Sequence, residues 1–229
     1  YRPHAHEAIA PEPVFQNEKT KALVKKSIEL RYRLKPYIYN MAFENSTYGK
    51  PLMIPLFFNE AENEMLLTYD KAYMWGDAFL VSPVKERGKK EQKIYFPKGT
   101  NWTDFYSGKA YNGGKEYTIS LTMEHIPVFV KGGAFIPMVK EAVNEMNYTL
   151  NEYEIHYFAD NQVKESYYKL FNDDGKTTHT LASGDYEFMT YWAENVDASL
   201  KITLQKTGAS DAYEAITNHV TLKVHNLLK

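Results

Sequence analysis

The longest helical pattern in the chain lies in residues 17–48. Apolar residues recur there every three, four or seven positions, which places them on one face of a helix. Pro36 lacks an amide hydrogen and clashes with the preceding turn, so it predicts a kink or a short break. Gly49 predicts the end of the helix, because glycine readily adopts the left-handed conformation found there. The apolar face consists of Leu23, Leu30, Leu34, Tyr37 and Met41.

After residue 49 the pattern changes to shorter segments. Residues 51–58 form an apolar run that contains Pro51 and Pro55, which favours a buried extended segment over a helix. Residues 68–75 fit one or two helical turns, and Gly76 would end them.

From residue 78 onward, short apolar or alternating segments are separated by Gly, Pro and Asn turns, which is typical of β-strands. Their close, regular spacing favours a sandwich. Residues 139–147 are polar and weakly helical, and we take them as the boundary between two sheet units. The predicted strands are 78–83, 92–96, 117–121, 128–131 and 134–137, then 152–158, 166–171, 186–192, 200–205 and 220–224.

Composition excludes several classes of protein. The 229 residues carry a net charge of −2, which argues against a basic nucleic-acid binder. No apolar run approaches the ~20 residues that span a membrane. The absence of cysteine excludes disulfides and thiolate metal sites. The 19 Tyr and 12 Phe favour β-sheet, although Tyr also suits sugar-stacking surfaces.

A dense polar cluster of Arg2, His4 and His6 stands at the start of the chain. Chain ends usually tolerate change, so this cluster favours a piece of a longer protein. His4 and His6 could bind a metal only with a third ligand, and no neighbour is a specific candidate. Arg2 and His4 could instead hydrogen-bond a polar ligand, and a purely structural histidine is the third interpretation. We predict no metal site.

Other acidic motifs have simpler interpretations. Asp173, Asp174 and the glycine after them resemble part of a calcium loop but lack its distal glutamate, so a turn explains them better. Glu60, Glu62 and Glu64 alternate in a polar segment, which is typical of a solvated face. There is no glycine-rich phosphate loop and no Gly-x-Ser-x-Gly motif. The residues alone therefore predict a helix followed by two β-sandwiches, without a function.

Several segments, taken in order, resemble the C-terminal third of glycoside hydrolase family 31, the α-glucosidase and α-xylosidase family. Residues 2–6 are similar to the Arg-Ala-His-Ala-His of the glucosidase II branch, and Glu12-Pro13 is similar to the Glu-Pro-Trp of the family. Residues 30–39 match its helix motif Leu-Arg-Tyr-x-Leu-x-Pro-Tyr-x-Tyr. Further segments follow family patterns at residues 49–57, 74–84, 95–104 and 126–137.

The resemblance implies a fold that combines α/β and all-β parts. Residues 1–75 would be the C-terminal end of a (β/α)₈ catalytic barrel, with its last strand and last helix. Residues 76–140 would be a proximal and residues 141–229 a distal antiparallel β-sandwich. Residues 1–4 would end the last barrel strand, and barrel enzymes place their active sites at the C-terminal ends of the strands.

The resemblance also implies a substrate-binding role for His4, which would donate a hydrogen bond to a hydroxyl of the sugar in the −1 subsite. Arg2 and His6 would support it. Members of the family are retaining enzymes with two catalytic aspartates about 5–5.5 Å apart. Both lie on earlier barrel strands, so no catalytic residue is assigned in this chain, and no cofactor is implied.

The implied activity is the hydrolysis of terminal, non-reducing α-linked glucose from oligosaccharides. The partners are then an α-glucoside oligosaccharide and the N-terminal remainder of the same enzyme, without nucleic acid or membrane; oligomeric state and compartment stay open. Two positions depart from the family pattern. Val14-Phe15 replaces the Trp expected after Glu12-Pro13, and Ile54 replaces the Arg expected before Pro55. An α-xylosidase and a non-catalytic carbohydrate-binding β-sandwich protein are the alternatives. The amphipathic helix favours an enzyme, because a free binding module does not need it.

Overall fold

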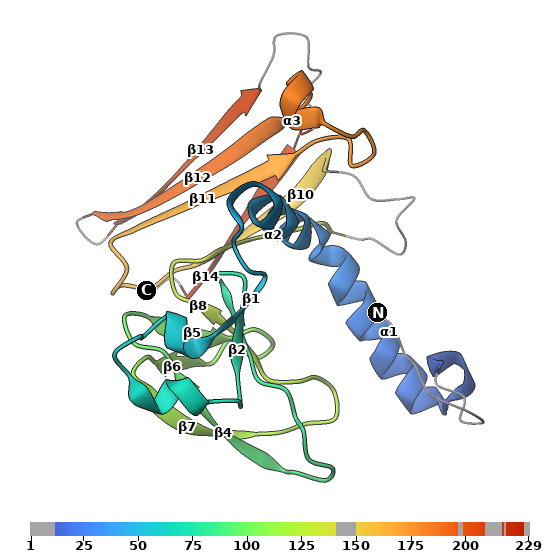
Figure 1. Cartoon of the computed structure of the whole chain (residues 1–229), viewed down its shortest axis with the longest axis vertical. Helices are drawn as coiled ribbons and strands as arrows, with labels where there is room; N and C mark the ends of the chain where they lie inside the picture. The colour runs from blue at the N-terminus through green and yellow to red at the C-terminus, as the bar shows by residue number, and fades with distance from the viewer. Residues whose placement is uncertain (1–11, 141–149, 197–198, 209–216, 218, 227–229) are drawn as a thin grey trace.

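The computed structural model describes residues 12–140, 150–196, 199–208, 217 and 219–226 (Figure 1). The described chain is mostly β-sheet in a sandwich-like arrangement, and two consecutive helices lie near its beginning. No helix in these ranges is both long and apolar enough to cross a membrane.

The predicted helical region folds as two helices, α1 (Glu18–Arg33) and α2 (Lys35–Tyr48). The break falls at Leu34, whose backbone φ and ψ are −81° and 4°. Pro36 then lies in the first turn of α2, where its missing amide costs no helical hydrogen bond. Gly49 ends α2 in the left-handed conformation with φ of 69°. Both the predicted break and the predicted end are confirmed.

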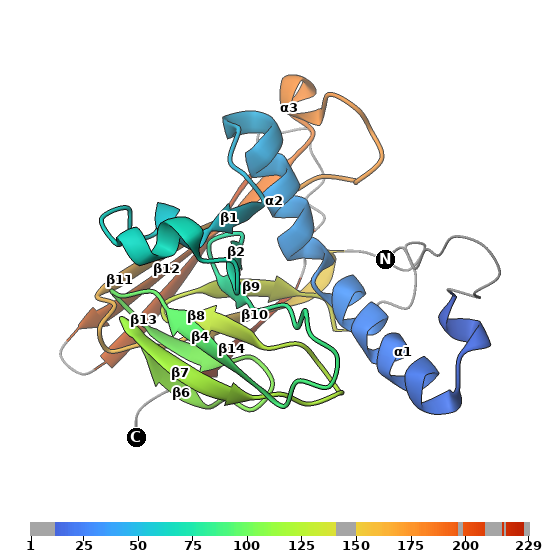
Figure 2. The ribbon, with the colours of Figure 1, turned by 60° about the horizontal axis from the view of Figure 1, so that its bottom comes forward.

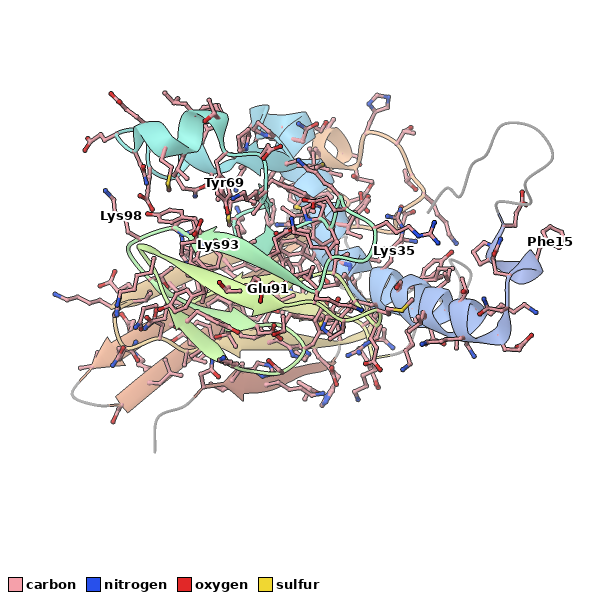
Figure 3. All side chains as sticks on the ribbon, turned by 90° about the horizontal axis from the view of Figure 1, so that it is seen from below. Phe15, Lys35, Tyr69, Glu91, Lys93 and Lys98 are labelled. Atoms are coloured by element: carbon pink, nitrogen blue, oxygen red, sulfur yellow. The ribbon has the colours of Figure 1, made fainter. Side chains whose placement is uncertain are left out.

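The first β-unit is a six-stranded sheet in the order β1-β2-β3-β8-β5-β6, in which every neighbouring pair is antiparallel. A two-stranded sheet of β4 (Glu91–Phe96) and β7 (Lys115–Ser120) packs against it around a shared apolar core. Glu91 and Lys93 are exposed on this small sheet (Figure 3). The six strands are β1 (Met53–Pro55), β2 (Tyr73–Trp75), β3 (Phe79–Val81), β5 (Asn101–Asp104), β6 (Ala110–Asn112) and β8 (Val128–Lys131).

Two local predictions for this unit are wrong. The segment 68–75 contains strand β2 after a short 3-10 helix, η3 (Glu64–Thr68), because β2 and β3 form a hairpin around Gly76. The run 51–58 contains β1 and the 3-10 helix η2 (Leu56–Phe58), of which only the leucine is buried. Apolar runs bounded by prolines do not specify which residues face the core.

The second β-unit packs two three-stranded sheets face to face. One has the order β14-β10-β9 and the other β11-β12-β13, with an apolar core between them. Strands β10 and β14 are parallel, and the other pairs are antiparallel. The elements are β9 (Phe135–Met138), β10 (Glu152–Phe158), β11 (Glu165–Asn172), α3 (Thr180–Ser183), β12 (Glu187–Val196), β13 (Ser199–Gly208) and β14 (His219–His225).

Helix α2 joins the two β-units. On one side the Tyr37 hydroxyl donates a hydrogen bond to the Trp75 carbonyl (2.8 Å) and accepts one from the Ala78 amide (3.3 Å). On the other side Asn40 Oδ1 accepts a hydrogen bond from the Phe171 amide (2.8 Å). Asn40 is buried although it is polar, which is favourable only because this bond is made. Helix α2 is therefore hydrogen-bonded to the first β-unit on one side and to the second β-unit on the other.

Helix α1 is different, because it extends past the edge of both units (Figures 1 and 2). None of its residues is buried. Before it, the short 3-10 helix η1 (Pro13–Phe15) carries Phe15 well away from the sheets (Figure 3).

The domain boundaries at 75/76 and 140/141 stay a prediction. Hydrogen-bonded strands cross both of them, since β2 pairs with β3 and β9 pairs with β10. The described residues contain no closed barrel, and the expected last barrel strand falls on residues 1–4, outside the described ranges.

Asp160 connects the loop after β10 to the start of β5. Its carboxylate accepts hydrogen bonds from the Thr100 hydroxyl (2.8 Å), the Asn101 amide (2.7 Å), the Asn101 side chain (2.9 Å) and the Gln162 amide (3.0 Å). Burial opposes ionisation of Asp160, but these hydrogen bonds outweigh it and lower the pKa of the carboxyl. A side chain at Gly132 would collide with the carboxylate. Asp160 thus holds the two β-units together.

We expect Asp160→Ala to lower the free energy of unfolding by about 3 kcal/mol, because the buried Thr100 hydroxyl and the partly buried donors of Asn101 lose a charged acceptor. The matched control is Asn161→Ala at the exposed neighbouring position, which should change stability by less than about 0.5 kcal/mol. Urea unfolding measures both. Equal unfolding midpoints for the two variants would contradict the role of Asp160.

Candidate functional site

A groove of about 920 Å³ lies between α1 and the six-stranded sheet. The helix contributes the apolar face predicted from the sequence, including Leu23 and Leu30. The sheet contributes Trp75 and Phe79, and Phe105 follows directly after β5; the Phe79 ring packs against both of the others with centroid distances of 5.7 Å. The floor of the groove is therefore apolar and largely aromatic.

The outer wall of the groove is the segment between β7 and β8. Met123 is 77% exposed and Ile126 is 46% exposed. Beside them the His125 ring stacks on Tyr106 with centroids 3.7 Å apart. The rim of the groove is charged, and its cations outnumber its acids; these residues are Arg31, Arg87, Lys89 and Lys90 with Glu86 and Glu124.

This groove suits docking better than catalysis. Exposed apolar surface of this extent with a polar rim is typical of an interaction surface. Its two acidic groups, Glu86 and Glu124, are rim residues beside several cations, so the groove offers no isolated carboxylate pair for acid–base chemistry. Among the residues that the structure describes, no group of three His, Asp or Glu side chains could hold a metal ion.

The predicted substrate-binding residue His4 lies outside the described residues, and so do Arg2 and His6. The structure therefore says nothing of their positions, and the role of His4 stays a prediction.

The acidic turn was predicted correctly. Asp173 Oδ1 accepts a hydrogen bond from the Gly175 amide (2.9 Å), and Asp174 Oδ1 accepts from the Thr177 amide (2.8 Å). The Tyr39 hydroxyl also donates to Asp173 (2.7 Å), which ties the turn to α2. These carboxylates are occupied by backbone and side-chain donors, as turn chemistry requires.

The expectation of a solvated face is wrong for Glu60, which is only 5% exposed. Its carboxylate accepts hydrogen bonds from the Tyr95 hydroxyl (3.0 Å), Asn63 Nδ2 (3.2 Å) and the Lys98 amide (2.5 Å). Burial, together with the Glu60 carboxylate, raises the pKa of Tyr95 to about 12. The alternation of acids in the sequence did not distinguish Glu60 from Glu62 and Glu64, because two of its three partners, Tyr95 and Lys98, lie at or just after the end of β4, far away in the sequence.

Comparison with known proteins identifies the family to which this chain belongs. Residues 49–136 match the glycosyl hydrolase family 31 C-terminal domain. An α-xylosidase of Saccharolobus solfataricus is 31% identical over 72% of this chain and 22% of its own length. The chain belongs to glycosyl hydrolase family 31. An α-glucosidase 2 of Bacillus thermoamyloliquefaciens is also 31% identical, over 86% of this chain and 24% of its own length.

Solved structures agree with this assignment. A dextranase of family 31 from Flavobacterium johnsoniae superimposes with a TM-score of 0.87 and 26% identity, over 96% of this chain and 27% of the dextranase. The catalytic subunit in a glucosidase II heterodimer shares the fold with a TM-score of 0.82 at 19% identity, over 95% of this chain and 24% of that chain. The chain thus spans about a quarter of the length of the relatives that it matches.

This family 31 chain also contains a titratable cluster around the buried Glu154 and His156 that the sequence did not reveal. His156 Nε2 lies 3.1 Å from Glu154 Oε2, and His156 Nδ1 lies 2.9 Å from His225 Nε2. Lys223 Nζ donates to Glu154 Oε1 (2.6 Å), and Arg33 Nη2 of α1 lies 3.8 Å from Glu154 Oε2. Strand alternation alone gave no reason to pair β10 with the last strand.

The hydrogen bonds determine which ring nitrogens carry a proton in this cluster. Since Glu154 accepts from His156 Nε2, the other nitrogen of the neutral His156 ring must accept from His225. A proton on His156 Nδ1 would face the donor of His225, so the folded state favours the neutral ring. Burial lowers the pKa of both His156 and His225. Burial alone would raise the pKa of Glu154, but Lys223 and His156 lower it.

We expect the free energy of unfolding to fall as the pH decreases below about 6.5, the ordinary histidine pKa. Below this pH the histidines of the unfolded chain bind protons, whereas His156 and His225 of the folded chain stay neutral because their pKa values are lowered. Acid therefore favours unfolding. The double variant His156→Gln/His225→Gln should lose much of this slope between pH 7.5 and 5.5. His219→Gln, at an exposed position of the same strand, should keep it. Urea unfolding at a series of pH values measures the slopes, and identical slopes in all variants would contradict the assignment.

Proposed function

We propose that this chain is the C-terminal part, without the catalytic aspartates, of a retaining glycoside hydrolase that removes terminal α-linked glucose from oligosaccharides. One observation carries the proposal: nearly the whole chain superimposes on the corresponding quarter of a family 31 dextranase. Curated relatives that are α-glucosidases support the glucose specificity. The finer division of the parent enzyme into a barrel end (1–75), a proximal sandwich (76–140) and a distal sandwich (141–229) is part of the proposal.

The groove beside α1 supports a role for the chain within the larger enzyme. In the proposed arrangement α1 and α2 are the last barrel helix, and the catalytic barrel covers the apolar face that includes Leu23 and Leu30. Burying exposed apolar surface stabilises the docked arrangement by roughly 25 cal/mol per Å². The chain would then brace the barrel without contributing a nucleophile.

The reaction itself requires two carboxylates about 5–5.5 Å apart, one as nucleophile and one as acid/base. In the proposal both come from earlier strands of the barrel, and His4 of this chain donates a hydrogen bond to a hydroxyl of the sugar in the −1 subsite. Such a bond strengthens as the sugar ring flattens toward the oxocarbenium-like transition state. A neutral imidazole near pH 7 serves as this donor.

A second specificity is favoured by one relative. The α-xylosidase of Saccharolobus solfataricus is as similar in sequence as the α-glucosidase. Glucose and xylose differ by one hydroxymethyl group, and in the proposal the residues that contact it come from the barrel.

We expect the 229-residue chain, expressed alone, to hydrolyse no α-glucoside or α-xyloside, while the full-length protein hydrolyses one of them. The physical reason is that both catalytic carboxylates come from outside this sequence. Release of 4-nitrophenol from the two aryl glycosides measures the activities. Turnover by the chain alone would contradict the proposal.

In the full-length protein, His4→Ala should lower kcat/KM roughly 5–150-fold. This corresponds to a loss of about 1–3 kcal/mol of transition-state stabilisation, which is typical of losing a polar contact. His219→Ala, at an exposed position of β14, is the control and should leave kcat/KM unchanged. Steady-state kinetics with a disaccharide substrate provides the test. Wild-type kinetics for His4→Ala would remove His4 from the site.

A further inference from the structure

The outer face of the sheet β11-β12-β13 carries two aromatic side chains next to each other. Tyr167 of β11 and Trp192 of β12 are direct partners in the strand register. Their ring centroids lie 5.6 Å apart, and the ring planes meet at 59°. Tyr167 is 59% exposed. Two partly exposed rings in this arrangement form a bent apolar platform.

Helix α2 covers only one end of this sheet face. Phe43 stacks on Phe171 with centroids 4.2 Å apart and also contacts Phe188 at 5.8 Å. Tyr167 lies four residues before Phe171 on the same strand, about 13 Å away at the usual rise of a strand. One end of the face is thus closed by packing, and the end with Tyr167 stays open to ligands.

The open end is surrounded by polar side chains. Thr203 of β13 is the register partner of Trp192, and Gln205 is the partner of Thr190 two residues along β12. Glu194 and Lys201 pair across the same two strands, with a distance of 3.5 Å between Nζ and Oε2. Because side chains two residues apart share a face of a strand, these hydroxyl, amide and charged groups lie beside the platform.

A cleft of about 520 Å³ adjoins the platform, with Tyr167 as a shared wall. Its other walls include Glu165, Gln162, Lys131 and Glu44. The cleft therefore offers hydrogen-bond donors and acceptors next to an aromatic ring.

The chemistry of this surface favours a neutral ligand with both apolar and hydroxyl faces. A protein partner would require a broader apolar patch at the centre of its interface. A nucleic acid or an acidic lipid surface would require an excess of cations. Here Lys169 and Lys201 are matched by Glu165 and Glu194 on the same face. Sugars present C–H groups to aromatic rings and hydroxyls to amide, hydroxyl and carboxylate groups.

We propose that Tyr167 and Trp192 form a carbohydrate-binding platform on the second β-unit, which binds an oligomer of α-linked glucose. The choice of sugar rests on the proposed function, whereas the platform itself rests on the sheet geometry. A sugar ring stacks on Tyr167 or Trp192, and the neighbouring sugar unit reaches the polar residues of the cleft or of β13. The platform would keep a polymeric substrate close to the enzyme.

Affinity electrophoresis of the 229-residue chain through gels that contain dextran or soluble starch tests the proposal. The chain should be retarded by at least one of the two polymers. Trp192→Ala and Tyr167→Ala should each weaken binding at least tenfold, in line with the loss of a stacking contact. Tyr48→Ala, which removes a 70% exposed tyrosine at the end of α2, should keep the wild-type retardation.

Two further measurements make the outcomes decisive. Urea unfolding checks that the alanine variants are folded, and Trp192→Phe, which keeps an aromatic ring, should retain binding within about threefold. No retardation of the wild-type chain by either polymer, or wild-type retardation of the double alanine variant, would overturn the proposal. Sedimentation equilibrium that shows a dimer lost in Trp192→Ala would overturn it in favour of self-association. Retardation in the gel needs no hydrolysis. An inactive full-length enzyme would therefore contradict the proposed function without changing the result for the platform.

Discussion

The arrangement of this chain depends on the way helix α2 is held between the two β-units. Tyr37 hydrogen-bonds to the hairpin of β2 and β3, while Asn40 and Phe43 contact β11 on the other side. A buried phenol and a buried amide are favourable only when their hydrogen bonds are made, so these contacts allow one placement of the helix. Asp160 adds a second connection, from the loop after β10 to β5. With both in place, the two units form one body.

The same constraint explains the groove. A single amphipathic pattern runs through α1 and α2, but the break at Leu34 directs only α2 into the core. Helix α1 continues past the sheets with its leucines partly exposed, and the six-stranded sheet presents Trp75 and Phe79 toward the same space. A helix without buried residues gains little stability from the described chain, since most helical stability in proteins comes from tertiary packing. The part of the enzyme that covers α1 is, in our proposal, the catalytic barrel.

The sequence predicted features with local causes and missed those that depend on distant partners. Pro36 and Gly49 marked the helix break and the helix end, because each acts on its own backbone. Strands β5 and β6 were missed, since each is short and is stabilised by pairing across the sheet. Glu60 was expected in solvent, but donors from Tyr95 and Lys98 make its burial favourable. The motifs of residues 1–137 predicted membership of family 31, which the comparisons confirm. They also predicted a role for His4, a residue outside the described part of the chain.

In our proposal, the remainder of a longer glycosidase covers the apolar face of α1. Amide hydrogen exchange of α1 and α2, compared between the 229-residue chain and the full-length protein, tests it most directly. Helix α2 is packed in both states, so its protection should be similar in the two proteins. The amides of α1 should exchange at least 100-fold more slowly in the full-length protein than in the chain alone. Equal exchange rates for α1 in the two proteins would contradict the claim.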